Sequence, residues 1–302
     1  MEQTIFKNEV IIDWLKYFSE NVELSLAKLK ILDITGKNKN LLPAVMCNRA
    51  VLVFTDAGHP TIFYDMWNAE LGDCEIWYNE GSEPAGQIKH NKVSEMIDRG
   101  INASAAMLIV NPAAVTNYQV GIENCRFSCG SVHYVCQEVR AVIMNKLNVG
   151  DQDNLCIISG ESIAVEAAMI ATDGHIVAVE YDQRDRETME ENVKNFGLSN
   201  VTIVESLADG LPAGLSVPDT AFIVASPRIN EEIASLLAIN PNIKFVIYTL
   251  DFELLATLPA IFRGSGLERT EALNIQVSRV NSKHMAEPFP APWLISGARS
   301  EG

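Results

Sequence analysis

The sequence is poor in basic residues, with 23 Lys and Arg against 39 Asp and Glu and a formal net charge of −16. A surface this negative repels phosphate backbones and anionic lipids, so we expect no binding to nucleic acid or to membranes. Long hydrophobic runs are missing as well, since no apolar stretch approaches the roughly 18 residues of a membrane span. The first residues, MEQTIFKNEV, lack the basic start of a secretory signal. We therefore expect a cytoplasmic protein.

Cysteine is also scarce, because six residues in a chain of 302 are too few for a disulfide scaffold. Four residues of metal-ligand type nevertheless lie close together, namely Cys125, Cys129, His133 and Cys136. Three thiols and an imidazole can close a tetrahedral zinc site or hold an iron–sulfur cluster. Their spacing matches neither a Cys-x2-Cys knuckle nor the usual cluster run, which favours independent thiols. We predict no bound metal and keep the metal site as the alternative.

The first half of the chain alternates short apolar runs with helix-length stretches. Apolar runs at residues 51–54, 75–78 and 105–110 predict strands, and the patterns at 61–71 and 93–100 predict helices between them. Continuously apolar strands separated by helices are typical of parallel sheets. The sequence therefore predicts a small α/β domain with parallel strands over residues 1–115.

The second half is more regular and follows a polar linker at residues 116–131. A helix is expected at 132–147, and later apolar runs predict five strands with helix-length stretches between them. Two final apolar segments, at 272–280 and 291–298, have no helix between them. Five parallel βα units closed by an antiparallel hairpin are the layout of a class I methyltransferase. We predict an α/β fold with a seven-stranded, Rossmann-like sheet over residues 116–302.

Particular motifs of this half carry a resemblance to a known family. They are QEVRAVIMNKLNVGD before the first strand, SIAVEAAMIA after it, VAVEYDQ at the second, ENVKNFGLSNVTIVES at the third, and the closing VSRVNSKHMAEPFPAPWLISG. Over roughly residues 130–298 the chain resembles the methyltransferase domain of the decarboxylating precorrin-6Y C5,15-methyltransferase family of cobalamin biosynthesis. Upstream, the segment from Leu32 to Ile88 is similar to the second half of a tetrapyrrole methylase domain. The resemblance implies a truncated C5 module joined to a full-length C15 and decarboxylation module.

The resemblance also implies S-adenosylmethionine as cofactor, bound by a glycine-rich turn after the first strand. Family members carry Asp-Ile-Gly-x-Gly-x-Gly there, whereas this chain reads Ile157-Ile158-Ser159-Gly160-Glu161-Ser162. One interpretation is a remodelled loop that binds the cofactor through Gly160 and the hydroxyl groups of Ser159 and Ser162. The alternative is an ordinary strand-to-helix turn capped by a serine, because Glu161 would repel the cofactor carboxylate.

Four further positions are implied as binding residues. An acid at the end of the second strand, Glu180, would accept hydrogen bonds from the ribose hydroxyls, although a solvated strand-end acid is the alternative. Ser206 and Leu207 follow the third strand, where the family contacts adenine. Arg228 could pair with a carboxylate of the substrate, or it could be an ordinary surface charge.

Arg140 is a second candidate for binding an anionic substrate. Its alternative is a helix-surface ion pair with Glu138. The family's Thr-Lys pair ahead of this helix is replaced by Val135-Cys136. Positions that shape the fold therefore match the family better than positions that touch the cofactor or the substrate.

Two functions follow from this pattern. The first is an S-adenosylmethionine-dependent methyltransferase that acts on a corrin precursor, working as a homo-oligomer, either a tetramer or a dimer. The second is a non-catalytic homologue that serves as a binding or assembly partner. A methyltransferase for another small molecule is a more distant alternative. Precorrins carry many carboxylates, so the net charge of −16 weighs against the first function unless a few arginines compensate locally.

Overall fold

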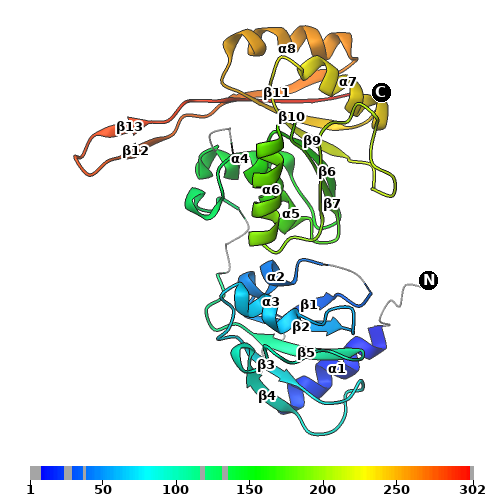
Figure 1. Cartoon of the computed structure of the whole chain (residues 1–302). Coiled ribbons are helices and arrows are strands. Elements are labelled where there is room, and N and C mark those ends of the chain that lie inside the picture. Colours follow the sequence, from blue (N-terminus) through cyan, green and yellow to red (C-terminus); the bar gives the residue numbers. More distant parts are fainter. Residues whose placement is uncertain (1–7, 24–28, 37–38, 116–119, 131–134, 300–302) are drawn as a thin grey trace. The chain divides into compact units, whose positions relative to one another are not determined.

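The computed structural model describes residues 8–23, 29–36, 39–115, 120–130 and 135–299. The chain divides into two compact units, which are treated separately below (Figure 1). Unit 1 comprises Met1–Tyr118 with Asn195–Ser199, and unit 2 comprises Gln119–Lys194 with Asn200–Gly302. Within the described ranges, no helix is long and apolar enough to cross a membrane.

Unit 1 is built on a five-stranded sheet in the order β1-β2-β5-β3-β4. The strands are β1 Leu29–Asp33, β2 Ala50–Thr55, β3 Glu75–Tyr78, β4 Lys89–Lys92 and β5 Ala105–Val110. Strand β1 pairs in parallel with β2, whereas β5 runs antiparallel to both of its neighbours, β2 and β3, and β4 runs antiparallel to β3. The prediction of a parallel sheet is therefore wrong for this unit. An uninterrupted apolar run indicates that both faces of the strand are buried. It does not indicate whether the neighbouring strand is parallel or antiparallel.

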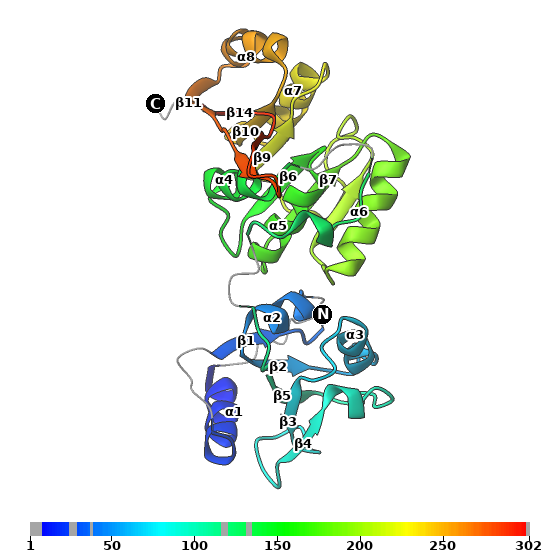
Figure 2. The same ribbon diagram turned by 90° about the vertical axis from the view of Figure 1, so that its left-hand side faces the viewer.

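Helices cover both faces of this sheet (Figure 2). Helix α1 (Asn8–Asn21) packs Trp14 and Phe18 against alternate residues of β2 and β5. Helices α2 (Leu41–Cys47) and α3 (Ile62–Asn68) cover the opposite face, where Val51 and Val53 point. The helix expected at 93–100 is reduced to one 3₁₀ turn, Val93–Glu95, and Val93 and the following Met96 are both buried.

Unit 2 is built on a seven-stranded sheet in the order β11-β14-β10-β9-β6-β7-β8. Five neighbouring strands, from β10 to the edge strand β8, are parallel, whereas β14 runs antiparallel to β10, and β11 runs antiparallel to β14. These strands are β6 Asn154–Ile158, β7 His175–Val179, β8 Val201–Val204, β9 Thr220–Val224, β10 Lys244–Thr249, β11 Glu268–Asn274 and β14 Trp293–Ala298. The predicted class I methyltransferase core is confirmed.

Five helices accompany this sheet: α4 Gln137–Leu147, α5 Glu161–Ile170, α6 Gln183–Asn195, α7 Ile229–Ile239 and α8 Phe252–Gly264. Residues of α7 and α8 pack on alternate residues of β6, such as Cys156 and Ile158. Ile157 points to the opposite face of the sheet, because successive side chains of a strand alternate between its faces. The strand order reverses between β6 and its two neighbours, β7 and β9. Ligands of open α/β sheets bind at the carboxyl ends of the strands beside such a reversal.

A separate two-stranded arm interrupts the final hairpin. Strands β12 (Ser278–Val280) and β13 (Ala286–Pro288) pair only with each other and are exposed along their whole length. In Figure 1 this arm extends well beyond the seven-stranded sheet. The base of the arm is attached to α4, because Arg279 donates a hydrogen bond of 2.7 Å to Glu138 Oε1.

Candidate cofactor site

The turn between β6 and α5 forms the centre of the candidate site. Ser159 has a left-handed backbone, with φ of +54°, and its N–H donates to the carbonyl of Val179 at 3.0 Å. Helix α5 starts immediately afterwards with Gly160 as its N-cap, and no side chain caps it. The expectation of a serine cap is therefore wrong.

Gly160 is required by packing, independently of any ligand. A β-carbon at this position would lie 2.8 Å from Cγ2 of Ile157 and 3.1 Å from the ring of Phe222. Both neighbours are fully buried strand residues, so neither can move away cheaply. The one glycine kept in this loop therefore lets α5 approach the sheet.

Replacing Gly160 by alanine should destabilise unit 2 by about 1–3 kcal/mol, the usual cost of overpacking. Chemical denaturation of the purified chain measures this change. Gly264→Ala is the matched control, since nothing lies within 4 Å of a β-carbon there. Equal stability of the two variants would show that the turn can relax around a methyl group.

Glu180 lies directly after β7 and is buried, with 3% of its surface exposed. Its carboxylate accepts a hydrogen bond from the N–H of Gly160, and its own N–H donates to the carbonyl of Val204 at 3.0 Å. Burial raises the pKa of Glu180 to about 8, with smaller contributions from the charges of Glu161 and Asp185. The alternative of a solvated strand-end acid is therefore wrong.

Two further buried carboxylates, Glu161 and Asp185, lie beside Glu180. The sequence analysis considered Glu161 only as a charge that would repel the cofactor carboxylate, and it did not single out Asp185. Burial raises the pKa of Glu161 to about 7, and the charge of Asp185 adds to this shift. Among the residues that the structure describes, Oε1 of Glu161 has no hydrogen-bond partner. We refer to Glu161, Glu180 and Asp185 as the acidic cluster. From the sequence alone, Glu161 and Asp185 resemble the acids that commonly occupy the first turn of a helix.

The main chain near Gly130 covers the acidic cluster. A β-carbon on Gly130 would overlap carboxylate oxygens of both Glu161 and Asp185. The same segment is fastened to α6, because Asn192 accepts from the N–H of Ser128 at 2.8 Å and donates to its carbonyl at 3.1 Å. A glycine at position 130 therefore allows the main chain to lie directly against the carboxylates of Glu161 and Asp185, and no atom of Glu180 is among its nearest neighbours.

A small cavity of about 250 Å³ lies at the ends of β7 and β8. It is lined by Ile158, Tyr181, Ser206, Leu207, Arg228 and Glu232, among others. Ligand pockets usually measure about 300–1,000 Å³, so this cavity suits one ring system better than a whole cofactor. The structure thus brings three of the predicted residues, Ser206, Leu207 and Arg228, to one place.

One wall of this cavity is a chain of polar contacts. The guanidinium of Arg228 lies over the ring of Tyr181, 4.4 Å from its centroid. The Tyr181 hydroxyl donates to Oε1 of Glu232 at 2.9 Å. Burial raises the pKa of Glu232 and also that of Tyr181. Arg228 is itself exposed, so it can meet a ligand at the mouth of the cavity.

Arg140 does not belong to the site. Its side chain is completely buried and pairs with Glu166, Nε to Oε1, at 2.6 Å. The same guanidinium donates to Asn124 Oδ1 at 3.0 Å and to the carbonyls of Val135 and Ile122. A side chain without exposed surface cannot bind a substrate, so the predicted substrate contact is wrong. The expected ion pair with Glu138 is also absent, since Glu138 pairs with Arg279.

The four candidate metal ligands are only partly described. Cys125 and Cys129 are exposed and Cys136 is partly exposed, whereas His133 lies outside the described residues. In the described part of the chain, no group of three or more Cys, His, Asp or Glu side chains is arranged to hold a metal ion.

Comparison with known proteins agrees with this geometry. The sequence model of a family described as precorrin methyltransferase domain matches residues 133–285, half of the chain. A precorrin-6y C5,15-methyltransferase from Geobacter metallireducens GS-15 is similar in structure, with a TM-score of 0.55 and 24% identity over 60% of this chain and 98% of that one. A precorrin-8W decarboxylase from Methanobacterium thermoautotrophicum has a TM-score of 0.51 and 21% identity over 58% and 98% of the two chains. A search of curated proteins gave no significant match.

The two solved structures share the class I methyltransferase fold of unit 2. The family match covers the helix α4, the loop at Ser159, the acidic cluster and the cavity beside Arg228. The resemblance in the sequence motifs is thereby confirmed, and the chain belongs to the precorrin methyltransferase domain family.

Proposed function

We propose that this chain binds S-adenosylmethionine and transfers its methyl group to a tetrapyrrole of the precorrin class. The observation that carries the proposal is Glu180, a buried carboxylate at the carboxyl end of the second parallel strand, held by the N–H of Gly160. Nucleotide-binding α/β sheets place an acid there to accept hydrogen bonds from the ribose hydroxyls.

The surrounding residues fit this cofactor in charge and shape. The cofactor carries a sulfonium and an ammonium group, and buried carboxylates favour nearby cations. The cavity beside Ser206 and Leu207 has the size of a nucleobase, and Arg228 at its mouth can pair with a substrate carboxylate. When bound, the cofactor supplies an electrophilic methyl group. The contribution of the chain is to orient the two reactants and exclude water, which needs no strongly activated side chain.

The finer identity of the reaction rests on the family resemblance. We propose a corrin precursor as substrate, in cobalamin biosynthesis, with methylation coupled to decarboxylation as in the precorrin-6Y family. We also propose that residues 1–115 correspond to the second half of a tetrapyrrole methylase, that residues 116–302 form the methyltransferase-like domain, and that the protein works in the cytoplasm.

Calorimetric titration with S-adenosylmethionine at pH 8.5 tests the role of Glu180, because its carboxyl group is mostly ionised there. Replacing Glu180 by alanine removes two charged acceptors, so we expect affinity to fall by about 10- to 100-fold. Glu190→Gln is the control, since Glu190 is an exposed residue of α6. Equal affinities of the Glu180 variant and the wild type would contradict the assignment.

A second function is favoured by Glu161, an acid that directly follows the one glycine of the cofactor loop and is buried beside two other acids. In that case the chain is a non-catalytic homologue that binds tetrapyrroles or assembles with other proteins. This function predicts a change in tetrapyrrole absorbance on mixing with the protein, without any binding of S-adenosylmethionine.

We further propose that the chain forms a homo-oligomer, a dimer or a tetramer, through the arm β12–β13. A two-stranded ribbon is at best marginally stable alone in water, and the arm exposes Val280 (71%) and Met285 (56%). A second copy would cover these side chains.

Sedimentation should therefore give a multiple of 33.2 kDa, and Val280→Ser combined with Met285→Ser should dissociate the assembly. A wild-type mass near 33 kDa would contradict this proposal.

A further inference from the structure

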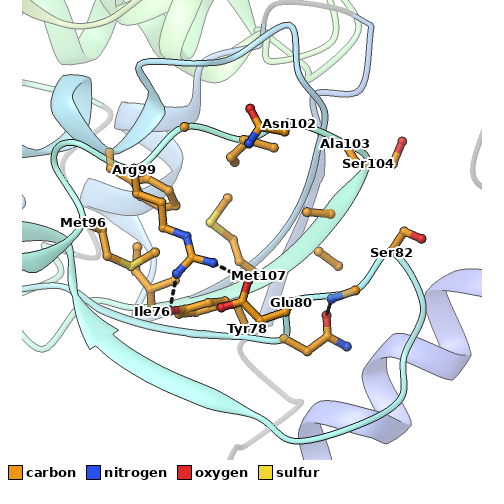
Figure 3. Close-up of a pocket in the computed structure, with 17 residues that line it drawn as sticks. Ile76, Tyr78, Glu80, Ser82, Met96, Arg99, Asn102, Ala103, Ser104 and Met107 are labelled. Carbon is orange, nitrogen blue, oxygen red and sulfur yellow. Dashed lines mark hydrogen bonds and ion pairs between the residues drawn. The ribbon is translucent and has the colours of Figure 1, made fainter.

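We propose that unit 1 contains a separate binding site for a small molecule that combines one carboxylate with an apolar body. The site is a cavity of about 420 Å³ where β3 ends and β5 begins (Figure 3). Its volume lies within the usual range of about 300–1,000 Å³ for ligand pockets. The cavity is lined by unit 1 alone, so the proposal does not depend on methyl transfer in unit 2.

The floor of the cavity is apolar. Phe63, Ile76, Met96 and Met107 line it and are each at most 3% exposed. Two methionines give such a floor an adaptable shape, because their side chains are unbranched and polarisable. The floor therefore suits the hydrocarbon part of a ligand rather than a fully hydrated ion.

One cation faces the cavity, and its position is fixed by the protein. Nη1 of Arg99 donates to the Tyr78 hydroxyl at 2.6 Å, and the guanidinium carbon lies 4.5 Å from the centroid of the same ring. The Tyr78 hydroxyl in turn donates to Oδ1 of Asn91 at 3.0 Å. Figure 3 shows the guanidinium held beside Tyr78 and Glu80, with Met107 close by. A guanidinium fixed in this way presents a planar fork that matches a carboxylate.

Glu80 now pairs with the guanidinium of Arg99, and a ligand carboxylate can replace it there. Nη2 of Arg99 donates to Oε2 of Glu80 at 2.8 Å, and Lys89 donates to Oε1 of the same carboxylate at 2.5 Å. The side chain of Glu80 is 55% exposed, so it can turn towards Lys89 and water when a ligand carboxylate takes its place on Arg99. Arg99, Lys89 and Glu80 together carry a charge of +1, whereas the formal net charge of the whole chain is −16. This balance favours a ligand with a single negative charge.

Phenylbutyrate, which joins a carboxylate to a phenyl ring, serves as the probe for calorimetry or NMR titration of the full chain. Phenylbutyramide is its neutral counterpart. We expect the acid to bind at least about tenfold more tightly than the amide, since only the acid can form a charge-assisted pair with Arg99. Arg99→Met should remove this preference. Lys92→Met should keep it, because Lys92 is an exposed cation that pairs with Asp73 outside the cavity.

A second variant separates recognition from any loss of structure. Glu80→Gln removes the competing carboxylate and should tighten phenylbutyrate binding about three- to tenfold, a gain that a damaged fold cannot produce. The proposal would be overturned by equal binding of acid and amide, by unchanged binding in Arg99→Met, by weaker binding in Glu80→Gln, or by no binding of phenylbutyrate at millimolar concentration.

Discussion

Replacing Arg140 by methionine should lower the free energy of unfolding by about 3–5 kcal/mol, the usual cost of removing one partner of a buried ion pair. Arg140 and Glu166 are both completely buried and lie 2.6 Å apart. Without the guanidinium, the donors left to Glu166 in the described part of the chain would be the N–H groups of Gly121 and Ile122, at 3.0 and 2.9 Å. A buried carboxylate with its counter-charge removed is strongly unfavourable.

Denaturant unfolding of four variants measures this effect, namely Arg140→Met, Glu166→Gln, the two combined, and a control. Lys146→Met is the control, because its ion pair with Glu271 is partly exposed and such pairs contribute at most about 1 kcal/mol. The double variant Arg140→Met with Glu166→Gln should be less destabilised than the sum of the two single variants, since neither buried charge remains. If Arg140→Met were no worse than Lys146→Met, this network would not hold the segment 121–124 in place.

The second large effect is a dependence of stability on pH that originates in the acidic cluster. The folded-state pKa of Glu161 is about 7, above the usual value of 4.5. Between these two pH values the folded chain binds more protons than the unfolded chain, so stability falls as pH rises through this window. Above pH 7 the penalty is complete and reaches about 3 kcal/mol. Glu180, with a pKa of about 8, extends the decline further.

The variant Glu161→Gln tests this assignment because it keeps the shape and removes the charge. It should be more stable than the wild type by about 3 kcal/mol at pH 8.5, and the difference should shrink steadily towards pH 5.5. Glu190→Gln, on the exposed side of α6, should follow the wild type at every pH. A difference that does not change with pH would rule out titration of Glu161 as its cause.

The fold of unit 2 could be predicted from its sequence because each apolar run and each helix pattern has a fixed place in the class I order. The buried network around Arg140 could not be predicted in the same way. Its partner Glu166 lies 26 positions later, and the other contacts come from the irregular segment at residues 121–124. Arg140 and Glu138 are two positions apart on one helix and therefore point in different directions.

The candidate site was predictable in part. The position of Glu180 follows from the strand order, which puts the end of β7 beside the reversal in the sheet. The burial of Glu161 and Asp185 depends on the close approach of Gly130, a contact between segments that no local pattern reports. In unit 1, the antiparallel direction of β5 was missed for a similar reason, because central strands are apolar in either direction.

Titration of the wild-type chain with S-adenosylmethionine at pH 8.5 is the measurement that bears most directly on the proposed function. With Glu180 and the cavity beside Leu207 acting as described, we expect micromolar affinity, or about −8 kcal/mol of binding free energy. The absence of any heat at millimolar cofactor, in a sample that unfolds cooperatively, would contradict cofactor binding and leave the non-catalytic function.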